Sequence, residues 1–131
     1  MIMDRSSEEM TPRLSTTVAI SSDSISGWLL KLGNAGKWNA DWKRRFFVLN
    51  GSELKFYADE HQAKQKGVID LTTATELKPF SSGAHGHAWP PSQTRFEVVT
   101  TGKTYLLSAA EGAASDKHLW LSALAEAMGL E

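Results

Sequence analysis

The chain has 131 residues, of which 41% are hydrophobic, and this is enough for one domain with its own core but not for two. Fourteen Lys and Arg residues face fifteen Asp and Glu residues, a balance that excludes a generic polycation for nucleic acid. The absence of cysteine excludes disulfides, thiolate metal sites and a cysteine nucleophile. No apolar run approaches the ~20 residues that span a bilayer, and no apolar signal core is present. We therefore expect a soluble, cytoplasmic monomer without a cofactor.

The N-terminal residues 1–24 are rich in Ser, Thr and acidic residues and show no sustained hydrophobic period. This composition is typical of a disordered or flexible leader. An alternative is that part of the leader, Leu14–Ile20, forms a short extra strand. The folded domain is predicted to occupy residues 25–129.

The first strand of the domain is predicted at Gly27–Leu32, and the following residues 33–41 are full of turn formers. This loop is long for a hairpin, and long loops are often functional. It carries Trp38 beside Lys37 near its tip. Trp38 is either exposed there or folded back on the loop, and the sequence leaves both open.

The central strand, Trp42–Leu49, is basic in its first half and aromatic and β-branched in its second half. Alternation along a strand puts Lys43 and Arg45 on the same face as Phe47 and Leu49. The two apolar side chains need a core, whereas the two cations cannot be buried unpaired. This face is therefore predicted to run from a hydrophobic interior to an open rim, where the cations converge on something negative.

A third cation, Lys31, is predicted to reach the same rim from the first strand. Strands joined by a hairpin are antiparallel neighbours, so the end of the first strand meets the start of the second. Lys31, Lys43 and Arg45 would repel one another there without a counter-anion. The sequence therefore predicts an anion site. The alternative is a structural rim in which Lys43 and Arg45 pair with Asp41 or Glu60.

Turn signals divide the middle of the chain into short strands. Asn50-Gly51 is a strong hairpin signal. Polar residues fill Asp59–Gly67, and Gly and Pro residues occur along Ser81–Gln93, so both stretches are predicted loops. The strands bounded by these signals are expected at Leu54–Tyr57, Val68–Leu71, Thr75–Phe80, Arg95–Thr100 and Lys103–Ser108.

Other basic residues in this part of the chain carry weaker signals. Arg44, Lys55 and Lys103 are predicted to be solvated surface charges. His85 and His87 have the spacing of a metal pair, but they lack nearby acidic or Cys ligands and are interpreted as part of a flexible surface loop. No metal site is predicted.

The hydrophobic period changes near the C-terminus. Ser115 or Asp116 is a suitable N-cap for a helix, and Gly129 is a natural stop. One amphipathic helix after seven strands must lay its stripe on the sheets, so it is expected to plug an open end of a β-sandwich or barrel with Trp120 as the largest plug. The stripe consists of Leu119, Trp120, Ala123, Leu124, Ala127 and Met128.

Seven strands followed by a helix with a central Trp resemble the pleckstrin homology (PH) domain. The resemblance covers roughly residues 25–129. It implies a mainly β fold, a seven-stranded antiparallel sandwich or barrel whose two orthogonal sheets have four and three strands, with one C-terminal helix closing one end and variable loops around the other. It rests on the motifs Gly27–Lys31, Trp42–Leu49, Leu54–Tyr57 and Leu119–Leu121.

One subset of PH domains binds 3-phosphorylated inositol lipids through Lys, a loop, and then Lys/Arg-x-Arg. Lys31 followed by Lys43 and Arg45 is similar to this pattern. The resemblance implies that these three residues contact the headgroup phosphates and that Lys66 is a further basic ligand. Trp38, if exposed, suits insertion at the headgroup level of the membrane.

Two features depart from that subset. Its members often carry a Tyr hydroxyl donor in the third strand, at a position that falls on Phe56 here, while Tyr57 points to the other face. The loop after the first strand is also longer, so Asn34 and Lys37 are candidate ligands without fixed places. A donor whose absence leaves a buried phosphate oxygen unpaired costs ~1–3 kcal/mol, which predicts reduced affinity or relaxed selectivity.

The leading hypothesis is a module that recruits its protein to the plasma membrane or another phosphoinositide-bearing membrane by binding PI(3,4,5)P3 or PI(3,4)P2. A soluble inositol phosphate would satisfy the same site. The alternative is a protein-interaction module of the same superfold that binds a peptide by strand addition near the helix. An enzyme is not predicted, because the sequence has no nucleophile–base pair and no Gly-rich phosphate loop that opens a helix.

Overall fold

The computed structural model describes residues 18–20, 24–34, 37–80, 89–112 and 115–130, and the statements below concern these ranges. They fold into β-strands, two short 3₁₀ turns and one α-helix. The elements are β1 (Ala19–Ile20), β2 (Ser24–Gly33), β3 (Asp41–Asn50), β4 (Glu53–Tyr57), β5 (Gln65–Asp70), η2 (Leu71–Thr73), β6 (Ala74–Lys78), η3 (Ser92–Thr94), β7 (Arg95–Thr100), β8 (Thr104–Ser108) and α1 (Asp116–Ala127).

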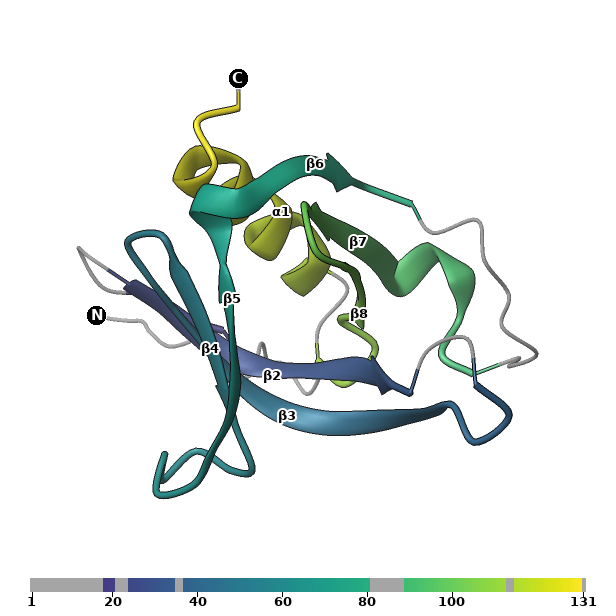
Figure 1. Cartoon of the computed structure of the whole chain (residues 1–131). Coiled ribbons are helices and arrows are strands. Elements are labelled where there is room, and N and C mark those ends of the chain that lie inside the picture. The colour runs from purple at the N-terminus through teal and green to yellow at the C-terminus, as the bar shows by residue number, and fades with distance from the viewer. Residues whose placement is uncertain (1–17, 21–23, 35–36, 81–88, 113–114, 131) are drawn as a thin grey trace, which may run out of the picture.

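The strands pair antiparallel in the order β5-β4-β3-β2-β8-β7-β6, and β1 adds to β2 outside this path. In Figure 1, β2 to β5 wrap around the lower and left-hand side, β6 to β8 lie above them, and α1 sits at the upper left. The two layers are joined where β2 pairs with β8, through Leu30 with Ser108 and Lys31 with Leu107. The predicted mainly β fold with one C-terminal helix is thereby confirmed.

The hairpin of β2 and β3 has the alternation that the sequence predicts. Its register runs without a break from Ser24 opposite Asn50 to Gly33 opposite Asp41. Phe47 is fully buried in the core, as expected for an aromatic residue on the inward face of a strand. The core-facing side of the hairpin thus extends from the closed interior to the loop between β2 and β3.

The prediction of a disordered leader is wrong at Ala19–Ile20 and at Ser24. Ala19 pairs with Ser26 and Ile20 with Ile25, so the alternative of a short extra strand holds for these two residues. The backbone groups of Ile25 and Ser26 on this edge of β2 thereby find partners, which explains why the chain extends alongside it. Residues 1–17 and 21–23 lie outside the described ranges.

The fourth and fifth predicted strands have different boundaries in the structure, where they are β5 (Gln65–Asp70) and β6 (Ala74–Lys78). β5 begins at Gln65 rather than Val68, because a register shift between Phe56 and Tyr57 lets the pairing continue into the predicted loop. The strand stops before Leu71, where the Asp70 carboxylate accepts hydrogen bonds from the Thr72 backbone N–H at 3.0 Å and its hydroxyl at 2.6 Å. These two bonds lower the pKa of Asp70 and fix the corner between β5 and β6.

The helix α1 closes one end of the molecule with the predicted stripe. Trp120 and Leu124 are fully buried in the main core cluster, so the predicted plug is confirmed. Gly129 takes a positive φ of 77°, and the Leu130 N–H donates to the Ala125 carbonyl at 2.8 Å, which is the glycine-dependent helix end expected here. Ser115, one of the two predicted N-cap positions, is the N-cap residue, although its side chain makes no capping hydrogen bond.

Candidate functional site

The centre of the candidate site is Lys31 on β2. Its side chain is half-buried, and its ammonium group lies 5.3 Å from the centroid of the Phe56 ring and 5.8 Å from that of the Tyr105 ring. Burial lowers the pKa of Lys31, and the charges of Lys103 and Arg45 lower it further. The two rings give the cation partial compensation, since each presents a negative face. A half-buried cation with two cationic neighbours is a point where an anion would bind favourably.

Lys103 is exposed, as the sequence predicted, but the structure also brings its charge close to Lys31. Its ammonium group lies 4.9 Å from the Tyr105 centroid, so the Tyr105 ring serves both lysines. A signal for this was present: Lys103, Tyr105 and the fully buried Leu107 alternate onto one face. The missing step was the pairing of β2 with β8, which sets Lys31 directly opposite Leu107.

The two basic residues of β3 differ in their partners. Lys43 pairs with Asp41 at 3.5 Å, as the alternative interpretation allowed, but both side chains are about half exposed, so this pair contributes little. The Arg45 guanidinium donates to the Arg44 carbonyl at 3.0 Å. Within the described part of the chain Arg45 has no carboxylate partner. The structure therefore places Arg45 and Lys31 together and leaves Lys43 beside them with a weak ion pair.

The loop between β2 and β3 adds Asn34 and Lys37. Asn34 has a positive φ of 55°, which asparagine tolerates well, and its carbonyl accepts a hydrogen bond from the Lys37 N–H at 3.0 Å. Both residues line an open cavity of about 470 Å³ that also borders the turn between β7 and β8. The remaining lining residues are Leu32, Gly102, Lys103, Thr104 and Tyr105.

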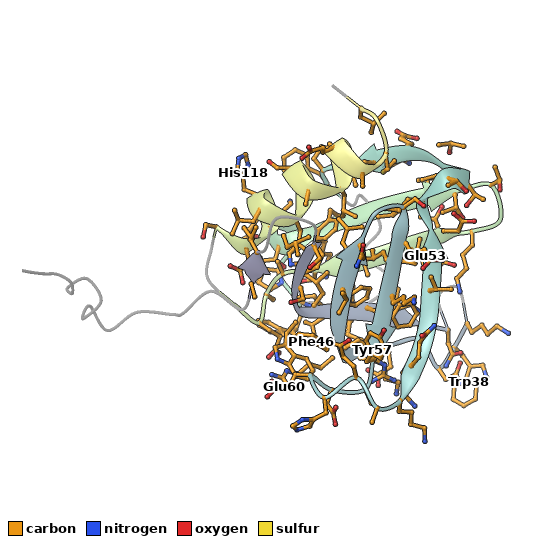
Figure 2. The ribbon with its side chains drawn as sticks, turned by 90° about the vertical axis from the view of Figure 1, so that its left-hand side faces the viewer. Trp38, Phe46, Glu53, Tyr57, Glu60 and His118 are labelled. Atoms are coloured by element: carbon orange, nitrogen blue, oxygen red, sulfur yellow. The ribbon has the colours of Figure 1, made fainter. Side chains whose placement is uncertain are left out.

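Trp38 lies near the tip of the same loop and is 97% exposed, so the interpretation that it folds back on the loop is wrong. Figure 2 shows Trp38 at the lower right, away from the helix at the top of the view. An indole with so little contact to its own chain is free to contact a membrane or another molecule.

Phe56 and Gly67 form the floor beneath Lys31. The Phe56 ring stacks on Phe47 with a centroid distance of 5.1 Å, and a Cβ placed on Gly67 would come within 2.5 Å of the Phe56 Cζ. Only glycine therefore leaves this ring in place. Tyr57 is directly opposite Phe46 in the strand register and lies on the other face (Figure 2), so its hydroxyl is not part of the site.

Lys66 is exposed on β5, at the register shift between β4 and β5, rather than in the predicted loop. No contact among the described residues joins it to Lys31, Arg45 or Lys103. Lys66 thus remains a candidate by resemblance alone.

The outward-facing Arg44 is exposed, as alternation suggested, and it also has partners on the surface. Its guanidinium lies 3.6 Å from the centroid of Trp28 and pairs with Glu111 at 3.3 Å. Lys55 is a partly exposed charge that pairs with Glu53 at 3.6 Å. Both belong to surfaces other than the Lys31 cluster, and Lys55 offers a matched control for it.

Among the described residues, neither a metal site nor a membrane-spanning helix competes with the candidate site described above. Across the described ranges, no group of three or more His, Cys, Asp or Glu residues could hold a metal ion. The predicted pair His85 and His87 lies outside those ranges. No described helix is long and apolar enough to cross a bilayer.

The lowered pKa of Lys31 predicts a pH-dependent stability. The unfolded chain binds more protons than the folded chain at alkaline pH below 10.5, so the free energy of unfolding rises with pH there. Lys31→Met, which keeps apolar contact with both rings, should be more stable than the parent near neutral pH. This advantage should shrink as the pH rises towards about 10, as measured by urea unfolding. A difference that is independent of pH would contradict the assignment.

The elements define a small antiparallel β-barrel that a C-terminal helix closes, with a basic rim on its open loops. The sequence model of the PH domain matches residues 24–129, and the chain belongs to the PH domain family.

Relatives and solved structures agree with this assignment. The chain is 33% identical over 104 residues to mouse Rho GTPase-activating protein 22 and 31% identical over 108 residues to Drosophila melanogaster protein daughter of sevenless, with 76% of this chain covered in both cases. The N-terminal PH domain of human ARAP2 has 26% identity and a TM-score of 0.59, with 84% of each chain covered. The C-terminal PH domain of human pleckstrin has 26% identity and a TM-score of 0.62, with 79% of this chain and 86% of that chain covered.

The chain spans only a small part of these curated relatives. It corresponds to 14% of the Rho GTPase-activating protein and 12% of daughter of sevenless. PH domains are typically non-catalytic modules of multidomain proteins, and the similarity concerns this module alone.

Proposed function

We propose that this PH domain is a membrane-targeting module that binds the phosphorylated headgroup of a phosphoinositide. The observation that carries the proposal is the cluster of Lys31, Arg45 and Lys103, drawn from both layers of the sheet around two aromatic rings. Burial lowers the pKa of Lys31, and the charges of Lys103 and Arg45 lower it further, so an anion bound at this cluster would be favourable. A headgroup phosphate would supply one.

The number of available cations is sufficient for useful affinity. A hydrogen bond between a charged group and phosphate contributes about 1.5–3 kcal/mol net. Three or four such bonds approach the roughly 8 kcal/mol of a micromolar complex. Each basic residue near an anionic membrane adds about 1 kcal/mol to the free energy of membrane binding, and Lys37 and Lys43 are exposed and could contribute in this way.

For the headgroup we propose the 3-phosphorylated lipids PI(3,4,5)P3 and PI(3,4)P2, on the resemblance of Lys31, Lys43 and Arg45 to the motif of that subset. Phe56 provides no hydroxyl donor, so the affinity is expected to be moderate. The C-terminal PH domain of pleckstrin has been solved in complex with D-myo-Ins(1,2,3,5,6)P5, which shows that this fold can hold a polyphosphorylated inositol. A soluble inositol phosphate shares that chemistry.

A protein-interaction role is the second candidate, and one observation favours it. An open cavity of about 440 Å³ lies between the start of β2 and the helix, and its lining includes Ile25, Leu49 and Leu119. Yeast BEM1-interacting protein 1 is 38% identical over 47 residues, which is 36% of this chain. This role predicts binding that ignores Lys31 and Arg45.

The test of the proposed function is co-sedimentation with liposomes that each carry one phosphoinositide, at physiological salt, with Arg45→Ala beside the parent. Lys55→Ala removes the same charge from a neighbouring strand and is the matched control. Selective binding that Arg45→Ala weakens about tenfold or more, and that Lys55→Ala leaves intact, is the expected result. Binding to all anionic liposomes in proportion to charge, or no binding, would reject a specific headgroup pocket.

A further inference from the structure

Trp89 is a second large aromatic side chain that the fold leaves in solvent. It is 56% exposed, whereas the next residue, Pro90, is fully buried. Trp usually contributes most of its area to a core or an interface, so an indole that is more than half exposed is a candidate for contact with another surface.

The backbone that carries Trp89 is held by a buried cation. Arg95 is only 3% exposed, and its guanidinium donates to the Pro90 carbonyl at 2.9 Å. The Thr94 hydroxyl and backbone N–H both donate to the Pro91 carbonyl, at 2.6 and 3.0 Å. Trp89 is thus presented from a rigid base, so that little conformational entropy is lost when its ring binds a partner.

Trp89 and Trp38 lie at the same end of the molecule. The Arg95 guanidinium that holds Pro90 lies 5.6 Å from the ring centroid of Trp42. Trp42 is the second residue of β3, which directly follows the loop that carries Trp38. In Figure 1 the loop between β2 and β3 and the segment that leads into η3 both reach the right-hand end of the view.

The candidate headgroup site and the segment that carries Trp89 lie on opposite sides of β3. Arg45 points to the inner, core-facing side of β3, and alternation places Trp42 on its outer side. Trp89, next to the residue that Arg95 ties to Trp42, therefore lies on the outer side of the hairpin. A membrane that contacts the loop tip at Trp38 therefore has Trp89 as a second exposed aromatic side chain at the same end of the molecule.

We propose that Trp89 is a second membrane-interface anchor, which inserts its indole at the headgroup level beside Trp38 when the headgroup is bound. This inference rests on the proposed function. A bilayer is the partner favoured by the charges and side chains present: indoles prefer the membrane interface, and the nearby Lys37 and Lys43 attract an anionic surface. A fixed second anchor would also restrict the angle at which the domain sits on the membrane.

The test separates membrane contact from headgroup recognition. Trp89→Ser, Trp38→Ser and the parent are compared for binding to phosphatidylcholine vesicles that contain PI(3,4,5)P3, and for binding to soluble inositol 1,3,4,5-tetrakisphosphate by calorimetry. Ile20→Ser removes an exposed apolar side chain near the helix and serves as the control. We expect Trp89→Ser to weaken vesicle binding by roughly five- to tenfold, the effect of returning part of an indole to water, with unchanged affinity for the soluble headgroup.

A second measurement does not depend on affinity. With brominated lipids in the vesicles, Trp38→Phe should retain quenchable tryptophan fluorescence, and the Trp38→Phe/Trp89→Phe double variant should lose it. Vesicle binding unchanged by Trp89→Ser, together with no quenching of Trp89, would overturn the inference and favour a protein partner for this indole. A parent chain that binds neither vesicles nor soluble headgroup would instead reject the proposed function itself.

Discussion

Lys31→Ala combined with Arg45→Ala is expected to weaken binding of a soluble inositol polyphosphate by about 10²- to 10⁴-fold. Each residue would lose a charge-assisted bond of about 1.5–3 kcal/mol, and 1.4 kcal/mol corresponds to a factor of ten. Isothermal titration calorimetry with inositol 1,3,4,5-tetrakisphosphate measures the loss directly. The side chains come from adjacent strands, with Arg45 opposite Leu29, so their effects should be coupled rather than strictly additive.

The matched control for this pair is Lys55→Ala with Lys64→Ala, which removes two charges outside the cluster. The control pair should bind as the parent does. Stability offers a second check: because Arg45 and Lys103 both lower the pKa of Lys31, removing Lys31 and Arg45 relieves repulsion in the folded chain. We therefore expect electrostatic interactions to cause no loss in the free energy of unfolding of the double variant. Equal loss of affinity in both pairs would mean that net charge alone drives binding.

Trp120→Ala is expected to cost about 3–5 kcal/mol of unfolding free energy, the range observed when a fully buried Trp or Phe is truncated. Trp120 is 0% exposed and lies in the same core cluster as Phe96 and Leu124. Its indole N–H has no hydrogen-bond partner among the described residues, so truncation leaves a cavity without stranding a polar partner. Urea unfolding monitored by circular dichroism measures the change.

Trp38→Ala is the control for this second prediction, because the same residue type is replaced where it makes almost no contact. It should change the free energy of unfolding by no more than a surface substitution does, about 0.5 kcal/mol or less. A Trp120→Ala chain as stable as the Trp38→Ala chain would show that the helix contributes little to the core. The two variants together separate the structural tryptophan from the exposed one.

Much of the fold follows from local patterns in the sequence. The hairpin of β2 and β3 and the stripe of α1 are predictable because alternation and helical spacing are properties of neighbouring residues. The start of β5 and the two-residue β1 are not predictable in this way. β5 depends on a register shift opposite Phe56, and β1 depends on a free edge of β2, both of which appear only when the strands are paired.

The candidate site divides along the same line. Lys31 and Arg45 meet because their strands are joined by a hairpin, a local relation that the sequence discloses. Lys103 meets them only through the pairing of β2 with β8, which joins residues more than seventy positions apart. The exposure of Trp38 was one of two open alternatives, since a loop sequence does not say on which side its indole rests. Whether these residues hold a headgroup is a matter for the titrations above.

The junction between the two layers of the sheet has a mechanical consequence. β2 belongs to both layers, yet it is bonded to β8 through only two residue pairs, Leu30 with Ser108 and Lys31 with Leu107. An anion held by Lys31 on β2 and Lys103 in the turn before β8 would link the two strands where they share only these two pairs. Ligand binding would then have an effect beyond the rim. The barrel would open less readily along β8, because a ligand that binds only the closed form shifts the equilibrium between open and closed forms towards the closed one.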